Sequence, residues 1–128
     1  MTRHLLRVSC KCALYTPDGK KVLLVEYGAH GFGLPGGHLD PDETPDQAME
    51  RELSEELGLS GIELQRKDFF FHPNGKLVLG FTARLEESTP LVVQLDEISG
   101  AVWVGVDQIA SGAVEAPSYK DFILSHQP

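Results

Sequence analysis

Three glutamates lie close together in the segment RELSEELG, Arg51 to Gly58. If this segment is a helix, Glu52 has Glu55 and Glu56 as its i+3 and i+4 neighbours, so the three carboxylates share one face. Each like-charge pair costs roughly 0.2–0.5 kcal/mol, and the negative end of the helix dipole adds about 0.3–1 kcal/mol per carboxylate. No Lys or Arg occurs between Glu52 and Gly58 to offset this repulsion. Such a face of oxygen ligands suits a hard divalent cation, Mg²⁺ or Mn²⁺, and predicts a metal site.

The helix that carries these glutamates has clear start and stop signals. Thr44 is a good N-cap, Pro45 suits the first helical position, and Gln47 completes a Thr-x-x-Gln capping box. Gly58 is typical of the residue that ends a helix. An apolar stripe runs beside the glutamates at i, i+4 and i+8, formed by Met49, Leu53 and Leu57. We therefore expect one side of the helix to pack on a sheet while the glutamate-bearing edge faces a cleft.

The remaining segments predict strands, turns and two short helices around that central helix. Turn signals at Asp18-Gly19 and Asn74-Gly75 indicate two hairpins, and the Gly- and Pro-rich residues 28–43 indicate an irregular working loop. Further strands are expected at 91–95 and 101–106, a short helical turn at 107–112 capped by Asp107, and a final helix at 118–127 capped by Ser118. This order, without regular βαβ alternation, predicts an α/β fold in which helices cover both sides of a mixed sheet.

The length and charge of the chain limit its class of function. We expect residues 1–128 to form a single domain, because this length suffices for one hydrophobic core. Eleven basic against nineteen acidic residues give a net charge of −8, which argues against binding nucleic acid or an anionic membrane through bulk charge. The sequence has neither a membrane-spanning apolar run nor the features of a signal peptide, and its two cysteines, Cys10 and Cys12, are expected to be reduced core residues. These features predict a cytoplasmic protein and leave monomer and homodimer open.

Nine positions between Gly37 and Leu59 follow a known pattern. Gly37, Glu43 and the segment Arg51–Leu59 resemble the Nudix box, G-x5-E-x7-R-E-U-x-E-E-x-G-U, where U is a bulky aliphatic residue, and every fixed position is met. The resemblance extends to the LPGG motif that ends at Gly37, to the strand pairs on either side of the box and to the late VWV motif. It implies an α/β/α sandwich with a mixed sheet, and the hydrolysis of a diphosphate linkage in a nucleoside diphosphate joined to a further moiety.

The resemblance also implies a role for the glutamates of the box. Glu52, Glu55 and Glu56 are expected to be ligands of Mg²⁺ or Mn²⁺, and one of the first two helps to deprotonate the attacking water. The carbonyl of Gly37 is expected to add a ligand. Because a diphosphate is also anionic, it needs metal ions to approach a protein with a charge of −8.

Three further residues follow from the family with different roles. Glu43 and Arg51 are expected to form an ion pair that holds the loop against the helix and so orients the catalytic groups. A loop shortly before the late Trp often supplies another carboxylate, for which Glu97 is our choice and Asp96 the alternative. Four basic residues could contact phosphate, and the sequence does not rank them: Arg7, Lys11, Lys21 and Arg84.

Three functions remain open at this stage. The favoured one is metal-dependent hydrolysis of a small nucleotide, such as a nucleoside triphosphate or ADP-ribose. A Nudix-like module that senses a nucleotide without cleaving it is the second, although such modules usually lose glutamates of the box. The third is an RNA 5′-end pyrophosphohydrolase, which the negative charge and the lack of a basic tail disfavour.

Overall fold

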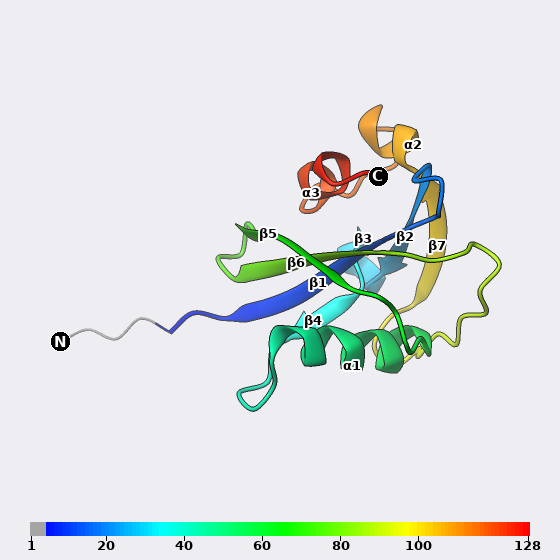
Figure 1. The fold of residues 1–128 in the computed structure, drawn as a ribbon. Coiled ribbons are helices and arrows are strands. Elements are labelled where there is room, and N and C mark those ends of the chain that lie inside the picture. Colours follow the sequence, from blue (N-terminus) through cyan, green and yellow to red (C-terminus); the bar gives the residue numbers. More distant parts are fainter. Residues whose placement is uncertain (1–4) are drawn as a thin grey trace.

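A computed structural model, which describes residues 5–128, contains one mixed sheet between two helical layers (Figure 1). Helix α1 lies on one side of the sheet, and α2 and α3 lie on the other. The strand order is β3-β2-β1-β6-β5, with β4 also paired to β1 and β7 also paired to β2. This architecture confirms the predicted α/β sandwich with a mixed sheet.

The helices and strands have the following bounds. The strands are β1 Val8–Tyr15, β2 Lys21–Glu26, β3 Phe32–Gly33, β4 Gly36–His38, β5 Gln65–Phe71, β6 Leu77–Arg84 and β7 Gly100–Gly105. The helices are the 3₁₀ turn η1 Gly28–His30 and the α-helices α1 Pro45–Leu57, α2 Val106–Ala110 and α3 Lys120–Ser125. None of the helices within residues 5–128 has the length and apolar character that a membrane crossing requires.

Strand β1 is central to the sheet, and its side chains contribute to the hydrophobic core on both faces. It runs parallel to β6 over its whole length, from Val8 opposite Leu77 to Tyr15 opposite Arg84. On its other side β1 pairs first with β4 and then, at Tyr15, with β2. Its side chains alternate: Cys10 and Cys12 are buried free thiols on the α1 side, as predicted, while Tyr15 faces α2 and α3.

Both predicted hairpins are present, and so are the predicted limits of α1. The β1–β2 and β5–β6 pairs turn at Gly19 and Gly75, whose φ angles are 73° and 92°. Helix α1 begins after Thr44, with both hydrogen bonds of the capping box, and ends at Gly58 in the left-handed conformation. The late strand β7 also forms, although Trp103 is only partly buried against the α1-side core.

The strand predicted at residues 91–95 is wrong. This segment is irregular, and its backbone bonds to the end of α1 rather than to the sheet: the N–H groups of Val92 and Gln94 donate to the carbonyls of Leu57 (2.9 Å) and Glu56 (3.0 Å). The last carbonyls of a helix lack partners within the helix, so an extended segment beside them can satisfy its own donors there. Its alternating apolar residues reflect partial packing of Leu91 and Val93 on the core, not membership of a sheet.

Three smaller expectations also need correction. The loop at 28–43 is not wholly irregular, because it contains η1, β3 and β4; β4 fills the edge that β1 leaves free where β2 diverges. Helix α2 starts after Gly105, whose N–H donates to the Gln108 side chain at 2.9 Å, so Asp107 lies inside the first turn. Helix α3 starts after Tyr119, not Ser118, because Tyr119 closes a turn onto Ala116 first.

Candidate active site

The packing of helix α1 on the sheet directs two of its glutamates toward β4. Its stripe of Met49, Leu53 and Leu57 is buried in the core and fixes the rotation of the helix about its axis. Glu52 and Glu56, one turn apart, are consequently directed toward the short strand β4, and their residues are only 9% and 2% exposed. Two carboxylates at such burial need a compensating charge or hydrogen bonds.

Glu97 joins these two glutamates from the other side. Glu52, Glu56 and Glu97 each offer a carboxylate oxygen, and these oxygens lie within 4.8 Å of one another. The segment before Glu97 is bound to α1 through Gln94, whose N–H donates to the backbone carbonyl of Glu56. The carbonyl of Gln94 accepts in turn from the N–H of Ile98, a buried residue. The structure thus brings the preferred Glu97 to the predicted site, while Asp96 is not one of the three clustered acids.

Two glycines of the LPGG motif allow the carboxylates to approach the backbone. The Gly36 N–H donates to Glu56 Oε1 at 2.7 Å, and a Cβ at Gly36 would lie 1.9 Å from the Cys10 carbonyl oxygen. A Cβ at Gly37 would lie 2.5 Å from Glu52 Oε1. The absence of a side chain lets Gly36 pack against β1 and lets the Glu52 carboxylate lie against the backbone of Gly37. The all-oxygen donor set of the site fits Mg²⁺ or Mn²⁺.

Burial makes these carboxylates reluctant to ionise without a cation. Burial is the main cause that raises the pKa of Glu56 to about 7. The nearby carboxylates of Glu52 and Glu97 raise this pKa further, whereas the hydrogen bond from the Gly36 N–H lowers it. Burial likewise raises the pKa of Glu52, although Arg51 opposes the change. A divalent ion would reverse both effects, because it stabilises the charged forms directly.

The predicted ion pair between Glu43 and Arg51 is present and doubly hydrogen-bonded. Arg51 Nε donates to Glu43 Oε2 at 2.7 Å, and Nη2 donates to Glu43 Oε1 at 2.9 Å. Nη2 also reaches the His38 carbonyl at 3.2 Å. Arg51 therefore joins the loop after β4 to α1, as expected for an orienting group.

Glu55 stands apart from the clustered acids. It is exposed, and its Oε2 accepts from Arg51 Nη1 at 3.2 Å, while the same nitrogen donates to Glu52 Oε1 at 3.0 Å. Helix geometry explains the separation, because Glu55 projects about 60° to one side of Glu52 and Glu56 about 40° to the other. The single face expected for three glutamates thus divides into a buried pair and an exposed residue linked to it by Arg51.

Sequence reasoning missed Tyr27 and did not rank Lys11. Lys11 is 5% exposed, and its Nζ donates to the Tyr27 hydroxyl at 2.9 Å and to the Gly36 carbonyl at 3.2 Å. Burial lowers the pKa of Lys11 to about 8. The Tyr27 hydroxyl also lies 3.3 Å from Glu56 Oε2. A lysine inside a largely apolar central strand was the available signal for this pair.

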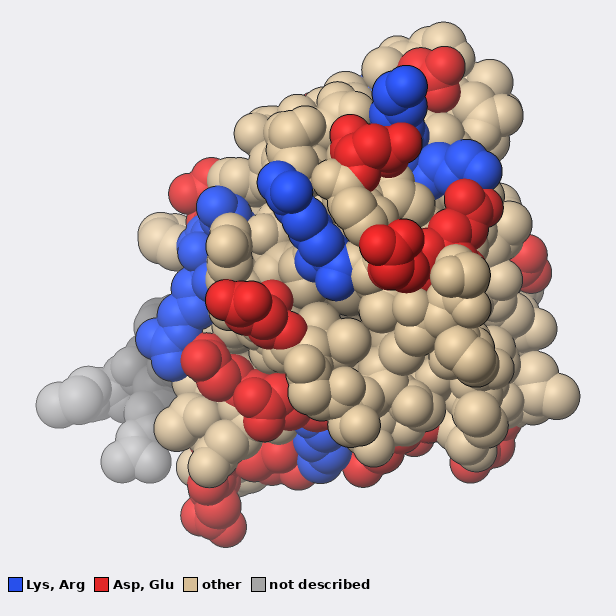
Figure 2. Space-filling model, turned by 45° about the vertical axis from the view of Figure 1, so that its right-hand side comes forward, with Lys and Arg blue, Asp and Glu red and all other residues tan. Residues whose placement is uncertain are grey.

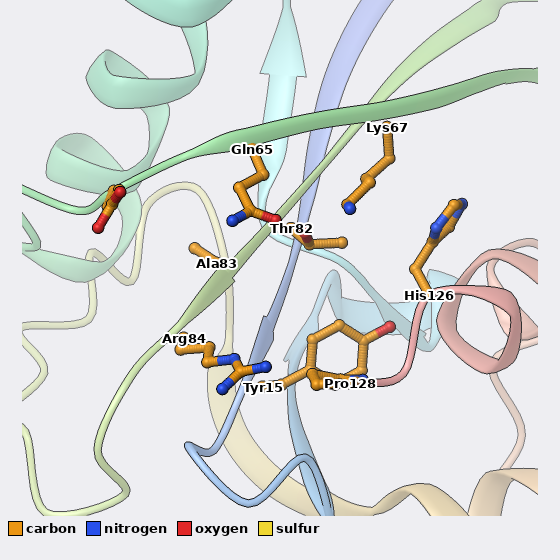
Figure 3. A pocket seen from close by; sticks show the side chains of 9 residues that line it. Tyr15, Gln65, Lys67, Thr82, Ala83, Arg84, His126 and Pro128 are labelled. Carbon is orange, nitrogen blue, oxygen red and sulfur yellow. The ribbon is translucent and has the colours of Figure 1, made fainter.

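The other basic candidates lie elsewhere. Lys21 pairs with Glu87 at 2.9 Å, and Arg7 lines a shallow hollow with His38 and Glu43. Arg84 borders a separate hollow of about 300 Å³ (Figure 3). The residues around that hollow include none of the clustered carboxylates; they are Tyr15, Glu63, Gln65, Lys67, Thr82, Ala83, Arg84, His126 and Pro128. Figure 2 shows acidic and basic side chains interleaved over one face of the molecule.

Comparison with known proteins agrees with this geometry. Residues 5–123 match the family model described as the NUDIX domain. The chain belongs to the Nudix domain family. This Nudix domain is also 50% identical over 42 residues to an RNA pyrophosphohydrolase from Aeromonas hydrophila, an alignment that covers 33% of this chain and 24% of that protein. The matched region is thus about a quarter of the length of that curated relative.

Solved structures of other Nudix proteins share the fold. The E. coli dihydroneopterin triphosphate pyrophosphohydrolase has a TM-score of 0.77 at 19% identity, and the match covers 97% of this chain and 98% of that one. The NUDIX domain of Shewanella oneidensis NrtR, solved with ADP ribose, has a TM-score of 0.77 at 20% identity, covering 96% and 86%. At these identities the likeness establishes the fold alone.

Proposed function

We propose that this Nudix domain hydrolyses a diphosphate linkage in a small nucleotide with the help of a divalent cation. The observation that carries the proposal is the convergence of Glu52, Glu56 and Glu97 beside the glycines of the LPGG motif. Nudix hydrolases generally need divalent metal ions, and an oxygen-only donor set favours Mg²⁺ or Mn²⁺ over softer metals.

The residues that would hold the ion are the three clustered glutamates, together with the Gly37 carbonyl. When bound, the ion supplies positive charge that lets an anionic diphosphate approach and that withdraws charge from its phosphorus. We also propose Glu55 as a ligand from the Nudix pattern; in this structure it lies outside the cluster and is linked to Glu52 through Arg51.

The chain itself supplies proton transfer and orientation. Glu52 and Glu55 are the proposed acceptors for the proton of the attacking water, and Arg51 Nη1 donates to their carboxylates at 3.0 and 3.2 Å, which orients both side chains. Glu43 acts indirectly, because its two hydrogen bonds hold Arg51 in place. The substrate is proposed to be a nucleotide such as a nucleoside triphosphate or ADP-ribose.

Two alternatives rest on specific observations. The curated relative named as an RNA pyrophosphohydrolase makes a triphosphorylated RNA 5′ end the second candidate substrate, although the net charge of −8 opposes bulk attraction to RNA. The NrtR domain solved with ADP ribose makes a sensing module the third. Against the sensor, every glutamate of the Nudix box is retained.

We further propose a cytoplasmic setting, a single domain over residues 1–128, and a monomer or homodimer.

A substrate panel tests the proposal. The wild-type protein is assayed with Mg²⁺ and with Mn²⁺ on nucleoside triphosphates, ADP-ribose, dinucleoside polyphosphates and a 5′-triphosphate oligoribonucleotide, with products identified by mass. We expect cleavage between phosphates, and a loss of turnover of at least about tenfold in Glu52→Gln, Glu55→Gln and Glu56→Gln. Tight nucleotide binding without turnover would instead support a sensor, and turnover of the oligoribonucleotide alone would support the RNA substrate.

A further inference from the structure

Glu56 is held at both carboxylate oxygens by groups outside α1. Its Oε1 accepts from the Gly36 N–H at 2.7 Å, and its Oε2 lies 3.3 Å from the Tyr27 hydroxyl. Tyr27 directly follows β2 and Gly36 is the first residue of β4, so two separate segments contact the same carboxylate. These contacts limit the rotation of a side chain that helix geometry alone would leave free to turn.

Lys11 donates to Tyr27 and so leaves the one phenol proton for another acceptor. Lys11 Nζ donates to the phenol oxygen at 2.9 Å, and a phenol carries one proton, so this proton remains available for another acceptor. The acceptors nearest to it are the Leu34 carbonyl at 2.9 Å and Glu56 Oε2 at 3.3 Å. Lys11 also donates to the Gly36 carbonyl, so the peptide groups on both sides of Gly36 are restrained, one by Glu56 and one by Lys11.

We propose that Tyr27 is a positioning residue, which holds the Glu56 carboxylate and the adjacent Leu34–Gly37 turn in the arrangement that binds the divalent cation. This inference rests on the proposed function, because it assumes that Glu56 is a ligand of the ion. Hydrogen-bond partners of metal ligands reduce the reorganisation needed on binding, and their removal typically costs about 10–100-fold in metal affinity or activity.

The chain offers a matched control in Tyr119. Its ring lies 6.0 Å from Lys11 Nζ and it is 6% exposed, yet within the described residues its hydroxyl makes no hydrogen bond. Tyr27→Phe and Tyr119→Phe therefore each delete one phenol oxygen from a ring near Lys11, and only the first deletes hydrogen-bond contacts, those with Lys11, the Leu34 carbonyl and Glu56.

The first experiment measures Mn²⁺ affinity without any substrate, from the electron paramagnetic resonance signal of free Mn²⁺. We expect Tyr27→Phe to weaken Mn²⁺ binding by about tenfold, Tyr119→Phe to leave it within about twofold, and the KM for substrate at saturating Mg²⁺ to change little in either. Equal affinity in wild type and Tyr27→Phe, or an equal loss in both variants, would overturn the inference. If wild-type protein failed to bind Mn²⁺, the proposed function itself would fail.

A second measurement tests the proposal without a substitution at Tyr27. The chain has three tyrosines, so protein labelled with 3-fluorotyrosine should give three ¹⁹F resonances, assigned with Tyr119→Phe and Tyr15→Phe. Tyr15 serves as an internal reference, because its hydroxyl donates to the Ile123 carbonyl at 2.6 Å. On addition of diamagnetic Mg²⁺ the resonance of Tyr27 should shift most, and a Tyr27 shift no larger than that of Tyr15 would contradict the proposal.

Discussion

Glu56 is the residue at which burial opposes charge most directly in this Nudix domain. In the folded, metal-free protein its pKa is about 7, against 4.5 for an unperturbed glutamate, chiefly because it is buried. Between these two values the folded state binds more protons than the unfolded state. Stability from this residue is therefore fully present below pH 4.5 and is lost as pH rises through about 7.

A comparison with Glu56→Gln isolates this effect, because glutamine resembles the protonated acid in shape and does not titrate. In the presence of chelator, the wild-type melting temperature should fall relative to that of Glu56→Gln as pH rises from about 5 to about 8. Thermal melts at closely spaced pH values, monitored by circular dichroism, measure the difference. A difference that stays constant with pH would mean that Glu56 ionises in the fold as easily as in the unfolded chain.

The neighbours Asp96 and Glu97 allow a second test at the same scale. Only Glu97 belongs to the clustered carboxylates, so Glu97→Gln should lower turnover with little change in stability, because an exposed loop acid contributes mainly to the reacting complex. Asp96→Asn should leave the rate within about twofold, as surface substitutions usually cost under about 0.5 kcal/mol. Steady-state kinetics at saturating Mg²⁺ separate the outcomes. A large loss in Asp96→Asn alone would show that the other neighbour supplies the carboxylate.

At the scale of elements, the end of α1 and the irregular segment 91–98 form one unit. Gly58 ends the helix at φ 67°, and a Cβ there would lie 2.9 Å from the Cβ of Val92. Val92 and Gln94 in turn donate to the last carbonyls of the helix, and the Glu97 N–H donates to the Gln94 carbonyl at 3.1 Å. The position of Glu97 thus depends on how this segment packs against the end of α1.

Gly58→Ala and Gly61→Ala form a matched pair for this dependence. Both glycines have left-handed backbones, with φ of 67° and 68°, but nothing lies within 4 Å of a Cβ at Gly61. Each alanine should cost about 1–2 kcal/mol for its backbone, and Gly58→Ala about 1–3 kcal/mol more for the contact with Val92. Urea unfolding measures the stabilities, and Mn²⁺ affinity should fall in Gly58→Ala only. Equal effects would show that segment 91–98 adapts without moving Glu97.

Local signals explain which elements could be predicted from sequence. Thr44, Gln47 and Gly58 act through contacts within a few residues, so the limits of α1 followed from residue types alone. The paired Glu43 and Arg51 followed from a family pattern that records a tertiary contact. The path of residues 91–95 could not be predicted, because its donors find carbonyls more than thirty residues away on α1. For the same reason the link from Tyr27 to Glu56 leaves no trace in spacing along the chain.

At the scale of the whole molecule, the net charge of −8 gives any divalent salt two ways to stabilise the fold. Specific binding at the carboxylates stabilises by mass action, by about 2.7 kcal/mol when the ion is at 100 times its Kd. Screening of general self-repulsion acts through ionic strength and needs no site. Removal of the Glu52 and Glu56 carboxylates should abolish the stabilisation by specific binding and leave the stabilisation by screening.

We expect Mg²⁺ or Mn²⁺ near 100 times its Kd to raise the melting temperature by about 5–15 °C, and chelator to remove the effect. KCl at matched ionic strength should give only a small increase, since it screens charge without occupying the site. The double variant Glu52→Gln/Glu56→Gln keeps a net charge of −6, from −8 + 2, and should respond to Mg²⁺ no more than to KCl. Without metal it should be at least as stable as wild type, because two buried, mutually repelling carboxylates are replaced by neutral amides. If Mg²⁺ raised the melting temperatures of wild type and double variant equally, the stabilisation would come from screening, and the carboxylates would not be the metal site.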